Sequence, residues 1–111
     1  MGILQWIVGL THEHKVDELA ETLAARSFEG VWDTVHDRAS MLSGHTLRGY
    51  VRARGGAVIR AELARVEEFV GVLTDEVRVR VVERALDDLV RRTLLRASTS
   101  RRVSAPRRAA A

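Results

Sequence analysis

The chain has 111 residues, contains no cysteine and carries a formal net charge of +3 at pH 7. This length supports one domain with a single core and excludes a two-domain enzyme with a cleft between its domains. The lack of cysteine excludes disulfides, thiol catalysis and thiolate metal sites. Since no basic stretch precedes the first apolar residues as in a signal peptide, we expect a cytoplasmic protein.

The positive charge is concentrated near the C-terminus. Residues 96–111 contain five arginines and no acid, so the rest of the chain carries −2. Residues 1–47 carry −4, whereas residues 47–65 carry +4. This pattern is typical of acidic and basic helices that pair within or between subunits, and it confines any nucleic-acid binding to one helix and one tail.

Residues 3–10 form a short apolar run that is about half the ~17–25 residues needed to span a membrane. We therefore expect no membrane span. The run is predicted to pack on the core or on a partner. The alternative is that Trp6 and Ile7 lie in a membrane interface.

Two helices are predicted in the first part of the chain, where no proline occurs. Thr11 is a candidate N-cap for the first helix, and Ser27 for the second. Apolar residues then recur at three- and four-residue steps, at Phe28, Val31, Trp32, Val35, Ala39 and Leu42. The alternative is one long helix bent near residues 27–30.

Ser43 and Gly44 separate these segments from the middle of the chain. After Gly55 and Gly56 the apolar face rotates by roughly 90° on a helical count, which indicates a kink or two helices. A β-hairpin around the glycine pair is the competing interpretation for residues 47–60. We favour helix because strong helix formers follow at residues 61–68.

The last helix is predicted to begin after Thr74, an N-cap followed by two acids, and to run to about Ala97. Its apolar face is wide because two lines of apolar residues lie beside each other. Residues 98–111 are rich in Ser, Arg and Ala and are predicted to be a disordered basic tail. The predicted fold is thus all-α: a small four- to five-helix bundle over residues 1–97, with a disordered tail over 98–111.

Candidate catalytic and metal-binding residues are few. The four histidines are His12, His14, His36 and His45. One Asp-x-x-His spacing occurs, ending at His36, without the second copy that a carboxylate-bridged metal site in a bundle needs. No Gly-x-Ser-x-Gly or phosphate-binding Gly-Lys-Ser/Thr motif occurs. We therefore expect a non-catalytic protein without a cofactor.

The predicted function is interaction or assembly, with a homo-oligomer or another protein as the partner. Two apolar surfaces are predicted to be buried against the partner: the N-terminal run and the second apolar line of the last helix. Their residues are Ile3, Trp6, Ile7, Leu10, Val82, Leu86 and Val90. One alternative is an accessory nucleic-acid-binding protein that uses the tail and a basic segment ending at Arg65. Its candidate phosphate contacts are Arg48, Arg52, Arg54 and Arg60. The other alternative is a small metal- or ligand-binding bundle that uses His36.

Overall fold

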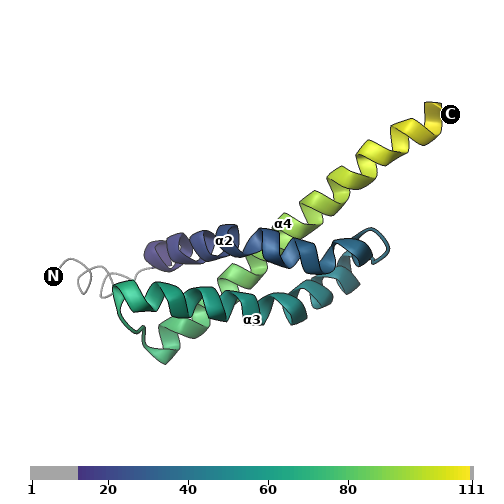
Figure 1. The fold of residues 1–111 in the computed structure, drawn as a ribbon. Coiled ribbons are helices and arrows are strands. Elements are labelled where there is room, and N and C mark those ends of the chain that lie inside the picture. Colours follow the sequence, from purple (N-terminus) through teal and green to yellow (C-terminus); the bar gives the residue numbers. More distant parts are fainter. Residues whose placement is uncertain (1–12, 111) are drawn as a thin grey trace.

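The computed structural model describes the backbone of residues 13–110 and the side chains of residues 15–99. Three helices account for this part of the chain: α2 (Glu13–Ala39), α3 (Gly44–Val70) and α4 (Asp75–Ala110). They pack side by side, with α3 running opposite to α2 and α4 (Figure 1). The all-α prediction is confirmed, and no strand occurs among the described residues. The prediction of four to five helices is not matched in this part of the chain, because two expected breaks lie inside continuous helices.

The first expected break, at Ser27, lies in the middle of α2. The Ser27 side chain is buried, and its hydroxyl has no hydrogen-bond partner among the described residues. Buried residues occur on both sides of it, from Val16 and Leu23 to Val31 and Val35. One continuous apolar face therefore runs the length of α2, and packing holds Ser27 inside the helix instead of at its start. Thr11 lies outside the described residues.

The second expected break, at Gly55 and Gly56, lies in the middle of α3. Helix is confirmed there and the hairpin is excluded. The buried positions follow one ridge at four-residue steps, Leu47, Val51, Gly55, Ile59 and Leu63. A Cβ on Gly55 would lie 3.1 Å from Cδ1 of Leu89 and 3.4 Å from Cδ2 of Leu86. The glycine is thus a member of the ridge, and its lack of a side chain lets α4 approach closely.

The ends of α3 and the start of α4 follow the capping residues in the sequence. Ser43 caps α3, and its hydroxyl accepts a 3.3 Å hydrogen bond from the backbone N–H of Thr46. Thr74 caps α4 in the same way, accepting a 3.3 Å bond from the N–H of Val77. Gly71 ends α3 with a φ of 97°, a conformation that favours glycine.

Helix α4 contacts both other helices and buries both of its apolar lines. Its backbone continues past the predicted end at Ala97 to Ala110, so the disordered tail is not confirmed. At 1.5 Å per residue, α4 is about 54 Å long and α2 and α3 are about 40 Å. The C-terminal part of α4 consequently projects beyond the bundle (Figure 1). Within the described part of the chain, no helix is long and apolar enough to cross a membrane.

Candidate functional site

The end of the bundle that carries the α3–α4 connection, residues 71–74, exposes large apolar side chains. We call it the connection end, and α2 also begins there (Figure 1). Phe69 is 75% exposed, Val72 76% and Val79 61%. Their neighbour Leu73 is 3% exposed. Three large apolar side chains within eleven residues thus remain in solvent, next to one that is fully packed.

A hydrogen-bond network centred on Glu67 fixes this connection. Its Oε2 accepts a 2.7 Å bond from the backbone N–H of Leu73 and a 2.9 Å bond from Nη2 of Arg78. Its backbone carbonyl accepts a 2.9 Å bond from the N–H of Gly71. The hydrogen bond to Glu67 raises the pKa of Arg78. Because Leu73 is held inward, the preceding Val72 is held in solvent as part of an ordered surface.

The predicted interaction residues divide into two groups. Ile3, Trp6, Ile7 and Leu10 lie outside the described residues. Val82, Leu86 and Val90 lie inside the bundle and are at most 9% exposed. The width of the apolar face of α4 is therefore explained by its two neighbours in the same chain, since α2 and α3 both pack against it.

Sequence reasoning missed Phe69, Val72 and Val79 as surface residues. For Phe69 the helical spacing of α3 already indicated an exposed position. The i, i+4 ridge of α3 continues from Leu63 to Glu67. Phe69 follows Glu67 by two residues, which is about 200° around the helix. No comparable signal marks Val72 or Val79.

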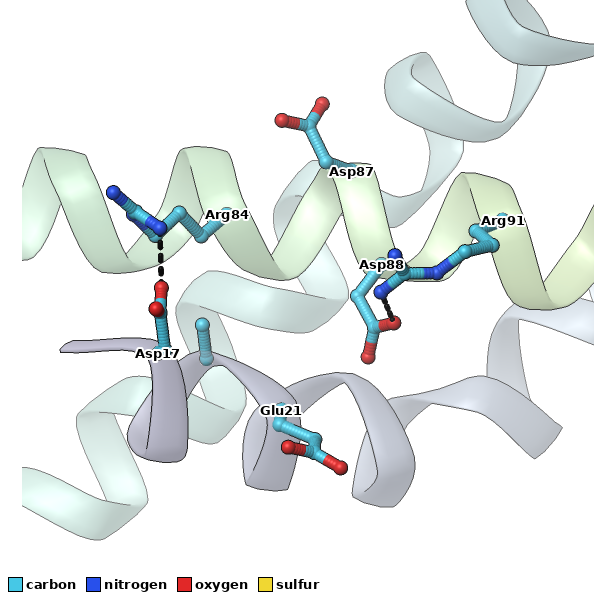
Figure 2. A pocket seen from close by; sticks show the side chains of 7 residues that line it. Asp17, Glu21, Arg84, Asp87, Asp88 and Arg91 are labelled. Carbon is cyan, nitrogen blue, oxygen red and sulfur yellow. Dashed lines mark hydrogen bonds and ion pairs between the residues drawn. The ribbon is translucent and has the colours of Figure 1, made fainter. Parts of the chain in front are cut away.

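A hollow of about 390 Å³ lies between α2 and α4 and is lined by Asp17, Ala20, Glu21, Arg84, Asp87, Asp88 and Arg91. Figure 2 shows Asp17 of α2 facing Arg84 of α4. Arg84 donates to Asp17, and Arg91 donates to Asp88. Glu21 acts on Arg91 electrostatically and helps to raise its pKa, behind the hydrogen bond from Arg91 to Asp88.

Asp88 is the most buried carboxylate of this hollow, with a side chain 11% exposed. Burial alone raises its pKa, but hydrogen bonds from Arg91 and Arg92 outweigh burial, so its pKa is below the ordinary value. The Nε of Arg92 lies 3.0 Å from Oδ2 of Asp88. All three residues belong to α4. The group therefore stabilises the ionised carboxylate of Asp88.

The four candidate phosphate contacts lie on one helix but in different environments. Arg52 donates to Glu83 and, at 3.0 Å, to Asp87, and these bonds raise its pKa. The guanidinium of Arg54 lies over the ring of Tyr50, 4.7 Å from its centroid. Arg60 lies against Gly56. Arg48 is exposed. Arg48 and Arg52 therefore do not form a free pair, because two carboxylates of α4 hold Arg52.

Arg96 of α4 packs over an aromatic pair of α2. Its guanidinium carbon lies 5.3 Å from the ring centroid of Trp32 and 5.9 Å from that of Phe28. Its Nη1 lies 3.7 Å from Oε1 of Glu29. No spacing rule in the sequence connects these residues. The contact joins α4 to α2 near the end of the bundle from which α4 projects.

His36 is held by its own helix. Its Nδ1 lies 3.2 Å and 3.1 Å from the carbonyl oxygens of Trp32 and Asp33, and its Nε2 lies 3.0 Å from Oδ1 of Asp37. Among the residues that the structure describes, no group of three His, Cys, Asp or Glu side chains could hold a metal ion. The side chains of His12 and His14 are outside the described part of the chain.

No protein-family model, curated protein or solved structure matches this chain.

Proposed function

We propose that the chain is a non-catalytic helical assembly protein that associates with a second copy of itself through the connection end. The observation that carries this proposal is the exposure of Val72 and Val79. Exposed apolar side chains concentrated on an ordered surface are typical of association sites. When two copies pack through the same surface, each removes the exposed apolar side chains of the other from water, and the result is a closed dimer.

The predicted N-terminal interaction residues support the same end of the molecule. Residues 3–10 precede α2, and α2 begins at Glu13 beside the α3–α4 connection (Figure 1). Ile3, Trp6, Ile7 and Leu10 lie outside the described residues and precede the helix that begins at this end. Val82, Leu86 and Val90 do not contribute to this surface, because they are buried in the core.

The nucleic-acid alternative receives less support from the geometry. Arg52 is held by Glu83 and Asp87, and Arg54 lies on Tyr50. A phosphate would have to compete with two carboxylates for Arg52. Arg48 and Arg60 are exposed, and neither is held by a carboxylate or an aromatic ring in the described part of the chain. We therefore place assembly first.

The test is the molar mass in solution, measured by light scattering after size-exclusion chromatography over a range of concentrations. We expect a mass above that of the 12.4 kDa monomer, and its loss in the double variant Val72→Ser, Val79→Ser. The matched control is Met41→Ser, because Met41 is 73% exposed but lies in the α2–α3 connection at the opposite end. A monomeric parent chain at high concentration, or an equal effect of Met41→Ser, would contradict the proposal.

A further inference from the structure

A second hollow, of about 620 Å³, lies mainly over α2. Its apolar lining residues are Leu19 and Ala25 of α2 and Val66 of α3, beside Thr22. Its charged lining residues are Glu18, Glu21, Arg26 and Arg92. Most of the lining residues of α2 are exposed, so the hollow is an open depression with apolar side chains among charged ones.

The apolar surface continues from this hollow toward the connection end. Phe69 follows Val66 by three residues, so the two side chains lie on the same side of α3, one turn apart. Glu62, seven residues before Phe69, marks that side, because it forms an ion pair with Arg26 of α2. The exposed ring of Phe69 therefore lies on the flank of α3 that faces α2.

The position at which α2 begins identifies a segment that can reach this surface. Glu13 precedes Leu19 by six residues, or about 9 Å along the helix. The twelve residues before α2 include six large apolar side chains in residues 3–10. Eight extended residues span up to about 28 Å, which is enough to turn back over the hollow. A short tether also gives this segment a millimolar effective concentration, an advantage over any free partner.

We infer that residues 3–10 pack on the hollow of their own chain, with Trp6 and Ile7 against Val66 and Phe69. Apolar side chains are then removed from water on both partners, and the driving force grows with the apolar area buried. The segment presents its outer side next to Val72 and Val79. This inference rests on the proposed function in one respect: the contact made by residues 3–10 and the proposed dimer surface both lie at the connection end.

Trp6 provides the readout. The chain has two tryptophans, and Trp32→Phe leaves Trp6 as the only indole while keeping an aromatic ring beside Phe28. In this background we expect Trp6 emission at short wavelength and weak quenching by acrylamide, both independent of protein concentration. Ala25→Arg places a long charged side chain in the hollow from an exposed helical position. We expect it to shift Trp6 emission to longer wavelength and to increase quenching, and Phe69→Ser to do the same.

The matched control is Ala53→Arg, because Ala53 is also an exposed helical alanine but does not line the hollow. It should leave Trp6 emission unchanged. Trp6 exposed in the parent background, or buried but unaffected by Ala25→Arg and Phe69→Ser, would overturn the inference. Burial lost on dilution together with the dimer would assign the hollow to the segment of a second copy. A spectral shift that needs anionic lipid vesicles would assign the segment to a membrane.

These results are separable from the proposed function. If Trp6 is buried and responds to the hollow variants while the parent chain is monomeric, the inference holds and the assembly proposal fails. If the mass exceeds that of the monomer but Trp6 emission does not respond to the hollow variants, the assembly proposal holds and the inference fails.

Discussion

In the middle of α3 a residue without a side chain is buried, whereas at the end of the helix a large apolar residue is exposed. Gly55, without a side chain, is buried against Leu89 and Leu86 of α4, whereas Phe69 is mostly in solvent. Both belong to one continuous helix. Burial along this helix is therefore decided by where α4 and α2 approach it, and hydrophobicity alone does not decide it. A small residue can be essential to packing, and a large one can be left for another contact.

The strongest test of the middle of α3 is Gly55→Val. We expect a loss of about 1–3 kcal/mol in the free energy of unfolding, because the added atoms overlap Leu89 and Leu86. Urea denaturation followed by circular dichroism measures it. Gly49→Val is the control, since a Cβ on Gly49 meets nothing within 4 Å. That variant should be slightly more stable than the parent chain, because valine is a better helix former than glycine. Equal effects at both positions would show that α4 does not approach Gly55 closely.

At the end of α3, Glu67→Ala removes the acceptor that holds the connection in place. The variant leaves the N–H of Leu73 without its charged acceptor, for an expected cost of about 1.5–3 kcal/mol in the free energy of unfolding. Amide hydrogen exchange at Leu73 should accelerate at the same time. Glu68→Ala, one residue further on at an exposed position, is the control and should change little. If Glu68→Ala costs as much, helix charge explains the effect and the hydrogen bond to Leu73 does not.

A smaller change in stability is expected at Ser27, a buried polar residue in the middle of α2. Ser27→Ala removes a hydroxyl that has no partner among the described residues and improves helix propensity. We expect a gain of about 1 kcal/mol in the free energy of unfolding, visible as a higher denaturation midpoint. A loss of stability would mean that the hydroxyl has a bound water or another acceptor.

The smallest expected effect concerns Asp88 and pH. Its pKa is lowered in the folded chain, so its contribution to stability is present above the unfolded value of about 3.9 and is lost as the pH falls through the folded value. Asp88→Asn should therefore be less stable than the parent chain at neutral pH, with a difference that shrinks as the solution is acidified below about pH 4. Thermal unfolding of both proteins from neutral to acidic pH measures this difference. A constant difference across that range would contradict the pairing of Asp88 with Arg91 and Arg92.

The sequence by itself determined the local features. The helical class follows from the helix formers and the lack of proline before the last residues, and Ser43 and Thr74 mark helix starts by their capping chemistry. These features depend on neighbours within one turn, which a sequence displays directly. The interpretation of Ser27 and Gly55 as breaks was wrong because both rules describe isolated helices, where no second helix covers the residue.

Only the tertiary structure decided which apolar and charged groups remain available. Val82, Leu86 and Val90 are covered because α4 lies against both other helices, whereas Phe69, near the end of α3, remains 75% exposed. Arg52 pairs with Glu83 and Asp87, more than thirty residues away in the sequence. Such contacts depend on how the helices are placed relative to one another, and the spacing of residues within one helix does not predict that placement.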